Sequence, residues 1–327
     1  MCCRKLSCLF DVDAQKSSRT MTRSSRSASP EHAYLDLGDV RLHYVHAGAG
    51  PLLMFLHGVP QCWYMWRHQL RDLATDHHVV AVDLRGFNES TVPARLYETG
   101  VLASVTDVEA LARHLGHARL TVIGHDVGVA VGWSFTLHHP SMTNGLVTIS
   151  GAHPALFDRA LREDPEQQRA LGHWLHLRRP DVADLFRRDR YARFRRILEE
   201  LPFLSDDDVA TYIRAWSRPG ALEGLLWWCQ REGWGPPEGT TPAKGNYVPE
   251  VSPLTTDVPV LAMYGDADPY IRPICYQGLD AYASDLTIHR IDGGTHWLCE
   301  ERPDVVNAKL RAFITKTSPR FSSARAV

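Results

Sequence analysis

The chain has 327 residues and a hydrophobic content of 44%, which is enough for one large core. Its 36 Lys and Arg residues against 38 Asp and Glu give a formal net charge of -2, which offers no electrostatic attraction for nucleic acid or for an anionic membrane. No apolar run approaches the roughly 20 residues that span a bilayer. The 7 cysteines are odd in number and lack paired metal-ligand spacing, so we expect a cytoplasmic, reduced protein.

The first segment, residues 1–30, differs from the rest of the chain. It is rich in Ser, Arg and Lys and has neither the long apolar core nor the small-residue cleavage site of a secretory signal. We expect a disordered tail, in which translation could start at Met1 or at Met21.

From residue 31 onward, short apolar runs alternate with segments of helical spacing. The predicted strands are 33–37 and 40–46 (a hairpin), 51–56, 78–82, 120–123, 146–150, 260–264 and 286–291. The predicted helices between and after them are 61–73, 102–115, 128–139, 274–283 and 303–314. This alternation is typical of an α/β fold with a mostly parallel, doubly wound sheet covered on both faces.

One long block interrupts the alternation. Residues 153–252 are helix-like and contain no convincing parallel strand. We therefore predict a core built from 31–152 and 253–318, with 153–252 as an inserted helical lid over an active site.

The most informative segment is Gly124-His125-Asp126-Val127-Gly128, where a predicted strand meets a predicted helix. Glycines two positions before and after a central residue are what a strained nucleophile elbow requires, because side chains do not fit there. The elbow would present the carboxylate of Asp126 at a helix N-terminus, whose dipole favours an anion. An Asp N-cap would produce the same local pattern, and the surrounding motifs decide between the two.

Three further segments favour catalysis. His57-Gly58-Val59-Pro60 follows the third predicted strand, so the backbone N–H groups of Val59 and Val127 are candidates for an oxyanion hole around a carboxylate oxygen of Asp126. Downstream, a strand ends in two acids, Asp266 and Asp268, and the last strand is followed by His296. Nucleophile, acid and histidine in this order match the triads of such folds.

Taken together, the chain resembles the epoxide hydrolase and haloalkane/haloacid dehalogenase branch of the α/β-hydrolase family. The resemblance runs from about residue 33 to residue 314 and is carried by HGVPQCWYMWR at 57–67, DLRGFNES at 83–90, GHDVG at 124–128, AWSRPGAL at 215–222 and GTHW at 294–297. It implies a cofactor-free and metal-free hydrolase that opens a small hydrophobic epoxide to a diol. The epoxide would form an ester with Asp126, and water activated by His296 would hydrolyse it. The resemblance assigns the acid to Asp268, with Asp266 as the alternative.

The lid departs from the family pattern. Epoxide hydrolases place two lid tyrosines over the nucleophile, and the alignment puts His173 and Cys229 at these positions. His173 is the leading predicted donor to the opening oxygen, Trp174 is second, and the weak thiol donor Cys229 contributes little. Trp228 and Trp297 are predicted to line the substrate pocket.

Two alternatives remain at this point. A dehalogenase would need halide donors where Val59 and Val127 stand, or carboxylate-binding arginines where Val127 and Ala130 stand. A hydrolase-like protein that only binds a hydrophobic ligand is the other alternative, and the complete triad argues against it. A homodimer is the one protein partner that we leave open.

Overall fold

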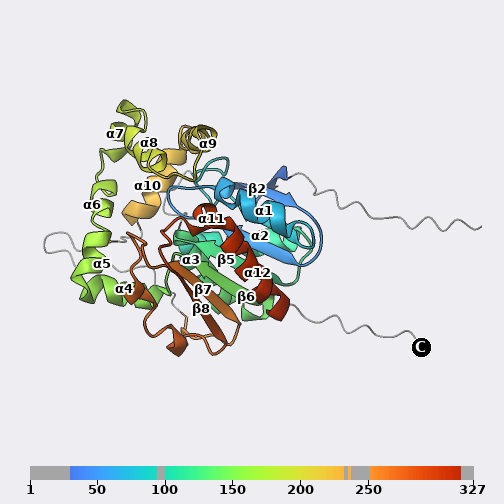
Figure 1. Cartoon of the computed structure of the whole chain (residues 1–327). Coiled ribbons are helices and arrows are strands. Elements are labelled where there is room, and N and C mark those ends of the chain that lie inside the picture. Colours follow the sequence, from blue (N-terminus) through green and yellow to red (C-terminus); the bar gives the residue numbers. More distant parts are fainter. Residues whose placement is uncertain (1–29, 94–99, 232–234, 237–250, 318–327) are drawn as a thin grey trace, which may run out of the picture.

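The structure is a computed structural model that describes residues 30–93, 100–231, 235–236 and 251–317. Within these residues the core is an eight-stranded sheet (Figure 1). Its strands are β1 (Glu31–Asp36), β2 (Arg41–Ala47), β3 (Leu52–Leu56), β4 (His78–Val82), β5 (Leu120–His125), β6 (Thr143–Ile149), β7 (Val260–Gly265) and β8 (Leu286–Ile291). Their order is β1-β2-β4-β3-β5-β6-β7-β8, with β2 antiparallel to both its neighbours and all other pairs parallel. The predicted mostly parallel sheet is confirmed.

The burial of each strand follows its place in the sheet. Every residue of the central strands β3 and β5 is buried, as expected for parallel strands that helices cover on both faces. The edge strands β1 and β8 are largely exposed or half-buried. The sequence reflects this difference, because β3 reads as an uninterrupted apolar run and β1 as a mixed one.

Helices flank the sheet on both faces. They are α1 (Arg67–Leu73), α2 (Val101–His114), α3 (Val127–His138), α11 (Leu298–Glu301) and α12 (Pro303–Thr317). Helix α3 packs against β5 and β6 beside α2, whereas α1 packs against β4 beside α12 (Figure 1). Helix α3 is buried along most of its length, so its first residue holds a fixed place above the sheet.

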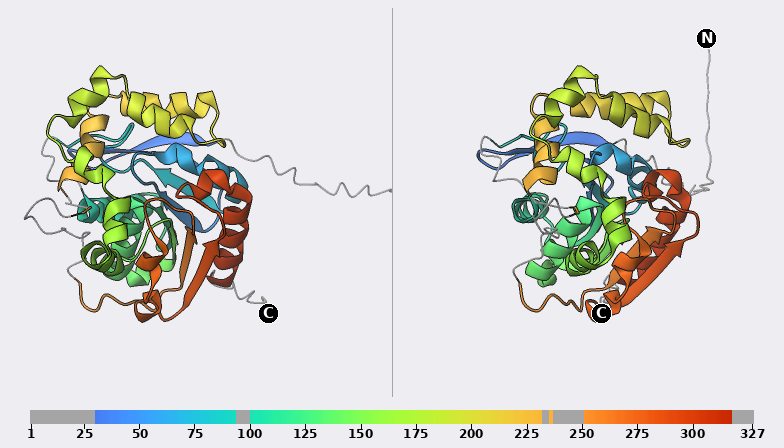
Figure 2. Two further views of the ribbon diagram at one scale, coloured as in Figure 1. Left: turned by 60° about the vertical axis from the view of Figure 1, so that its left-hand side comes forward. Right: turned by 90° about the vertical axis from the view of Figure 1, so that its left-hand side faces the viewer.

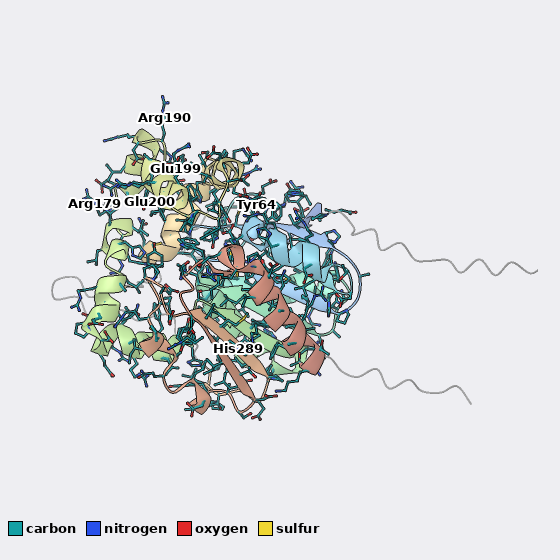
Figure 3. The ribbon with its side chains drawn as sticks, viewed as in Figure 1. Tyr64, Arg179, Arg190, Glu199, Glu200 and His289 are labelled. Carbon is teal, nitrogen blue, oxygen red and sulfur yellow. The ribbon has the colours of Figure 1, made fainter. Side chains whose placement is uncertain are left out.

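Between β6 and β7 the chain forms the lid. Its helices are α4 (Pro154–Glu163), α5 (Pro165–Ala170), α6 (His173–Leu177), α7 (Val182–Arg188), α8 (Ala192–Glu199), α9 (Asp206–Trp216) and α10 (Ala221–Arg231). Figure 2 shows α7 to α9 lying across the top of the core. Charged side chains such as Arg179, Arg190 and Glu200 point outward from this block (Figure 3), where Arg196 pairs with Glu200 at 3.1 Å.

A buried carboxylate joins the lid to the core. Glu300, at the start of the C-terminal helices, is only 4% exposed. Its oxygens accept hydrogen bonds from the Tyr212 hydroxyl of α9 at 2.9 Å, from Gln61 Nε2 at 2.6 Å and from Arg67. Burial raises the pKa of Glu300, while Arg67 and Tyr212 oppose that rise. A buried carboxylate needs such donors, so this cluster holds α9 in one position over the core.

Two close approaches fix the lid further. The indole Nε1 of Trp216 donates to the carbonyl oxygen of Pro60 at 2.5 Å, next to the predicted oxyanion loop. In α10, Gly224 lies against the backbone of Gly86, where an added Cβ would come within 2.0 Å of the Gly86 carbonyl oxygen. The lid backbone therefore touches the core directly, without side chains between the two.

Two predicted helices differ in the structure. The helix expected at 274–283 is replaced by short 3₁₀ turns at Pro273–Tyr276 and Leu279–Ala281, because Gly278 between them adopts a left-handed φ of 86°. The helix expected at 61–73 begins with a 3₁₀ turn at Trp63–Trp66 before α1. The predicted disordered tail at 1–30 and both candidate start residues lie in 1–29, outside the described residues.

Three histidines meet where β2 ends and β4 begins. His78 Nδ1 lies 2.9 Å from His117 Nε2, and His78 Nε2 lies 3.4 Å from His46 Nδ1. Burial, and then the two neighbouring rings, lower the pKa of His78 from 6.5 to about 4. Such a chain of hydrogen bonds needs neutral rings, since each pair requires one acceptor nitrogen.

We expect this cluster to make stability depend on pH. The folded-state pKa lies below the unfolded value, so the unfolded chain takes up the proton first as the pH falls below 6.5. The free energy of unfolding should therefore decrease between pH 6.5 and about 4, by about 1–2 kcal/mol because water screens the half-buried ring. In His78→Gln, urea unfolding across this range should show a smaller decrease. The exposed His114 of α2 gives the control, His114→Gln, which should keep the wild-type slope; an unchanged slope in His78→Gln would contradict the prediction.

Candidate active site

Asp126 occupies the sharp turn between β5 and α3. Its backbone has φ 52° and ψ -118°, a conformation that costs energy for any residue with a side chain. The flanking glycines make the turn possible: a Cβ on Gly124 would lie 2.4 Å from the Gly128 carbonyl oxygen, and one on Gly128 would lie 2.2 Å from that of Leu56. The structure thus contains the tight turn that the GHDVG pattern predicts.

The two oxygens of Asp126 have different surroundings. Oδ1 accepts a hydrogen bond from the backbone N–H of Val59 at 2.8 Å, and the N–H of Val127 also donates to this carboxylate. Gly58 allows the approach, because a Cβ there would lie 2.4 Å from the Asp126 Cβ. Oδ2 instead lies 3.7 Å from His296 Nε2. One oxygen is therefore held by donors, and the other faces the histidine.

Burial governs the charge of this carboxylate. It raises the pKa of Asp126, whereas His296 and the two backbone donors favour the ionised form. The side chain is 14% exposed. A carboxylate with so little water around it is a stronger nucleophile than one in bulk solvent, because less hydration has to be removed before it attacks.

His296 and Asp268 form a buried pair. Asp268 Oδ2 accepts from His296 Nδ1 at 2.8 Å, and its Oδ1 accepts from the backbone N–H groups of Tyr270 at 2.7 Å and Ile271 at 3.0 Å. Burial opposes protonation of His296, but Asp268 outweighs it, so the pKa of His296 is raised. The His296 carbonyl oxygen lies 2.8 Å from His125 Nε2, which fixes the loop that carries the ring.

The alternative acid makes other contacts. Asp266 Oδ1 accepts from the backbone N–H of Gly293 at 2.7 Å, and its other oxygen lies 3.7 Å from Arg290 Nε. Of the two acids predicted from the sequence, Asp268 is the one that contacts His296.

A small cavity opens above Asp126, under the lid. It has a volume of about 70 Å³, and its lining is mostly apolar and aromatic. It is lined by Val59, Pro60, Asp126, Leu171, His173, Trp174, Leu177, Phe194, Ile197, Tyr270, His296 and Trp297. A second cavity of about 30 Å³ shares Asp126, Leu171 and Trp174 with the first. Asp126 thus stands where two small apolar spaces meet.

The predicted lid residues divide into two groups. His173, Trp174 and Trp297 line the main cavity. Trp228 and Cys229 on α10 are fully buried and line neither cavity; Trp228 packs against the Phe87 ring at a centroid distance of 6.1 Å. Burial, and then the charge of Asp126, raise the pKa of the Cys229 thiol.

The protonation state of His173 decides which hydrogen bonds its ring can make in the cavity. Burial lowers its pKa from 6.5 to about 4, so the ring is neutral at neutral pH. A neutral imidazole has one N–H donor and one acceptor nitrogen. The role of His173 as a hydrogen-bond donor to the opening oxygen stays a prediction.

Tyr270 is the polar residue of the cavity lining that the sequence did not lead us to predict; the others are the apolar Pro60, Leu171, Leu177, Phe194 and Ile197. Its ring lies edge-on to His296 at 5.1 Å between centroids and 89° between planes, and 5.0 Å from the ring of His173. The available signal was its position two residues after Asp268, since the acid loop must lie beside the histidine loop.

The described residues contain one cluster that could hold a metal ion, formed by His32, His43 and Glu89. Its atoms already have partners. His43 Nδ1 lies 2.6 Å from Asp83 Oδ2, its Nε2 lies 2.9 Å from His32, and Glu89 accepts from the Tyr34 hydroxyl at 2.5 Å. It lies on β1, β2 and the loop after β4, outside the cavity above Asp126. The absence of metal and cofactor from the reaction stays a prediction.

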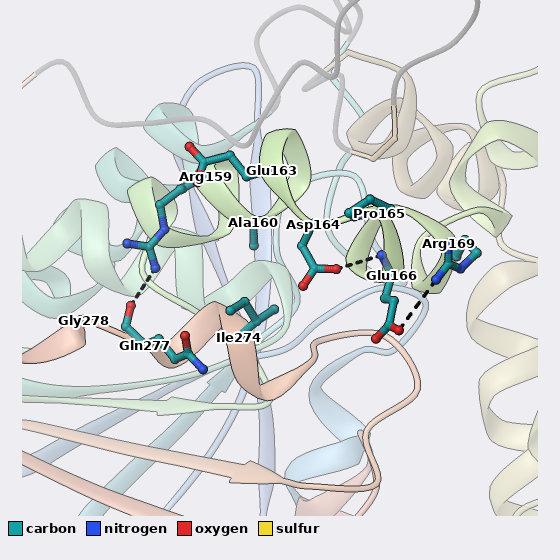
Figure 4. A pocket seen from close by; sticks show the side chains of 10 residues that line it. All are labelled: Arg159, Ala160, Glu163, Asp164, Pro165, Glu166, Arg169, Ile274, Gln277 and Gly278. Carbon is teal, nitrogen blue, oxygen red and sulfur yellow. Dashed lines mark hydrogen bonds and ion pairs between the residues drawn. The ribbon is translucent and has the colours of Figure 1, made fainter.

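A larger surface groove of about 880 Å³ lies between α4, α5 and the turn at Pro273–Tyr276 (Figure 4). Polar groups of its lining contact each other: Glu166 lies 3.7 Å from Arg169, and Arg159 donates to the Gln277 backbone carbonyl oxygen at 2.7 Å. None of the triad residues lines it. We therefore place the reaction in the smaller cavity.

Comparison with known proteins agrees with this geometry. Residues 51–303 match the model of the alpha/beta hydrolase fold family, and the chain belongs to that family. It is 31% identical to a soluble epoxide hydrolase from Corynebacterium sp. (strain C12), covering 86% of this chain and 96% of that protein. It is 28% identical to mouse epoxide hydrolase 4, over 92% and 87% of the two chains. An epoxide hydrolase variant from Bacillus megaterium superposes with a TM-score of 0.79 at 30% identity, over 86% of this chain and 100% of that one. The resemblance and the fold class inferred from the sequence are confirmed.

We expect the two acids to respond differently to mutation. Asp268→Asn should remove the low-field proton NMR signal of a His296 Nδ1–H bound to a carboxylate, and should slow catalysis by about 10⁴-fold, as the wrong imidazole tautomer does elsewhere. Asp266→Asn is the matched control and should keep the signal and most of the rate. Circular dichroism would verify that both variants fold. A larger loss of catalytic rate in Asp266→Asn than in Asp268→Asn would mean that Asp266, and not Asp268, is the acid of the triad.

Proposed function

We propose that the chain hydrolyses small hydrophobic epoxides to diols through an ester on Asp126. The observation that carries the proposal is the asymmetric Asp126 carboxylate at the cavity, with Oδ1 held by the backbone N–H of Val59 and Oδ2 on the side of His296. The epoxide hydrolases among the relatives support the choice of substrate.

In the first step, Oδ2 of Asp126 attacks a ring carbon of the epoxide. The C–O bond breaks, and its electron pair moves to the oxirane oxygen. Attack by Oδ2 leaves Oδ1 as the carbonyl oxygen of the new ester, where it already accepts from the N–H of Val59, and the N–H of Val127 also donates to this carboxylate. Oδ1 therefore occupies the oxyanion hole before the reaction, and the hole needs no rearrangement.

In the second step, water attacks the ester carbonyl carbon. His296 Nε2, on the Oδ2 side of the carboxylate, takes a proton from that water. Negative charge then develops on Oδ1, where the N–H of Val59 stabilises it, and the N–H of Val127 adds to that stabilisation. Asp268 holds the ring through Nδ1 and stabilises the imidazolium. Collapse breaks the bond between Cγ and Oδ2, so that Oδ2 leaves with the substrate. The leaving alkoxide takes the second proton of the attacking water, which releases the diol and restores the carboxylate.

The cavity limits the substrate. Its lining of Leu171, Phe194 and Trp297 fits an apolar substituent on the epoxide. The second cavity, of about 30 Å³ against about 70 Å³, offers less room on the other side of Asp126. We therefore propose terminal epoxides with one apolar substituent.

The alternatives find less support in the site. A dehalogenase needs donors or cations for the halide or carboxylate, and the aligned positions carry the apolar side chains of Val59, Val127 and Ala130. A protein that only binds a ligand does not need the buried pair of His296 and Asp268. Among the described residues, no helix is long and apolar enough to cross a membrane. The cytoplasmic location and the homodimer stay predictions from the sequence.

We expect the ester to accumulate when the second step is blocked. His296→Gln should still react with styrene oxide or propylene oxide but should hydrolyse the ester very slowly, since it lacks the base. Intact-mass analysis should then show one substrate mass added per chain, located on Asp126 by peptide mapping. His289→Gln, a histidine variant on β8 outside the site (Figure 3), should turn over normally and stay unmodified.

Heavy-oxygen water gives an independent readout of the same intermediate. In a single turnover the solvent oxygen should enter Asp126, and the diol should carry the former carboxylate oxygen. If all of the diol formed in a single turnover carried solvent oxygen, that result would contradict the covalent mechanism.

The pH dependence of ester hydrolysis should report His296. The ring must be neutral to accept a proton, and its pKa is raised above 6.5, so the rate of ester decay should fall as the pH drops through a midpoint above 6.5. Asp268→Asn removes the charge that raises this pKa and should move the midpoint to lower pH. Single-turnover decay of the ester, followed by quenched-flow mass analysis, measures both. A decay rate independent of pH between about 5 and about 8 would exclude His296 as the base.

A further inference from the structure

The proposed ring opening requires a proton donor at the oxirane oxygen. The product of ring opening is an alkoxide unless a donor supplies a proton, and a lone alkoxide in an apolar cavity is strongly disfavoured. The two lid positions that the sequence comparison identifies do not provide it. Burial lowers the pKa of His173 to about 4, so its ring is neutral and can donate a hydrogen bond but does not release its proton at neutral pH, and Cys229 lies outside the cavity with a thiol whose pKa burial raises. Another group has to act as the acid.

Tyr270 lies in the right place for this role. It belongs to the core loop after β7, not to the lid, and lines the cavity together with Asp126 and His173. Its backbone N–H donates to Asp268 Oδ1 at 2.7 Å, which ties the residue to the triad. Its hydroxyl makes no hydrogen bond to any other described residue. A phenol that borders an apolar cavity without a partner is available to a substrate oxygen.

We propose that the Tyr270 hydroxyl donates its proton to the oxirane oxygen as Asp126 opens the ring. The proposal rests on the epoxide function above and names the acid for its first step. Burial, and then the charges of Asp268 and Asp126, raise the pKa of Tyr270, so the phenol is fully protonated before substrate reacts. Because a phenol is a stronger acid than an aliphatic alcohol, transfer of its proton to the nascent alkoxide is downhill.

The proton balance closes within the site. Ring opening leaves the ester on Asp126, a hydroxyl on the substrate and a phenolate at Tyr270. Ester hydrolysis then leaves a proton from water on His296. The rings of Tyr270 and His296 lie 5.1 Å apart between centroids, so that proton can return to the phenolate through a bridging water or the product hydroxyl, which restores both residues. The sum is epoxide plus water giving diol, without an external acid or base.

Two other groups at the cavity have N–H donors, the indoles of Trp174 and Trp297. An indole N–H can donate a hydrogen bond to the substrate oxygen, but it does not release its proton at neutral pH. These residues can therefore orient the epoxide without completing the proton balance. Residues of both kinds line the same cavity, so hydrogen bonding by an indole and proton transfer by a phenol differ in chemistry and not in position.

The test separates ring opening from hydrolysis. In a His296→Gln background, where the ester accumulates, Tyr270→Phe should lower the rate of ester formation with styrene oxide by at least about 100-fold, the lower range for loss of a general acid. Rapid-quench intact-mass analysis would measure this rate at several substrate concentrations. The effect should appear in the maximal rate and not in the concentration for half-saturation, because phenylalanine keeps the ring and the shape of the cavity.

A matched control is Tyr282→Phe in the same background. Tyr282 packs its ring on His153 at 4.0 Å and lines neither cavity, so its hydroxyl should not affect ester formation. Equal rates in Tyr270→Phe and Tyr282→Phe, with ester formed in both, would overturn the role of Tyr270 and leave the epoxide function standing. If His296→Gln alone forms no ester with either styrene oxide or propylene oxide, the epoxide function fails and the role of Tyr270 fails with it.

Discussion

The site depends on one strained residue. Asp126 adopts a φ of 52°, and the surrounding backbone is packed closely, since a Cβ on Gly58, Gly124 or Gly128 would come within 2.4 Å of a neighbouring atom. The strain is offset by the packing of β5 and α3, which are buried throughout most of their length. Because the turn is fixed, the positions of both carboxylate oxygens are fixed as well. Oδ1 has to face the loop after β3, and Oδ2 has to face the loops after β7 and β8.

The lid extends this arrangement to the substrate side. Tyr212 and Trp216 of α9 reach Glu300 and Pro60, so the lid is anchored to the segments next to the oxyanion loop and the histidine loop. Breaking either contact would leave a buried donor, the Tyr212 hydroxyl or the Trp216 indole N–H, without its acceptor, which commonly costs about 1–3 kcal/mol. The cavity is therefore bounded by a lid whose position is coupled to the catalytic loops, and its small size is a property of both parts.

The sequence predicted those features that depend on local chemistry. The elbow follows from two glycines at fixed spacing, and the oxyanion donors follow from backbone groups at two strand ends. Features that depend on which way a helix face turns were not predictable. Successive residues on a helix point about 100° apart. An error of one residue in the alignment of α10 would therefore change which side chain, Cys229 or a neighbour, is placed over the nucleophile. Tyr270 was missed for a related reason, since its contact with His296 arises from two loops that only the folded sheet brings together.

A carboxylate nucleophile also explains why ring opening needs a separate acid. A serine nucleophile gives its own proton to the histidine, which can return it to the leaving group. An ionised Asp126 has no proton to give, and His296 remains neutral until water attacks. Ring opening therefore needs a proton from a third residue, and that residue must recover a proton before the next cycle. Because the ring of Tyr270 lies beside that of His296, a bridging water or the product hydroxyl can carry the proton between them.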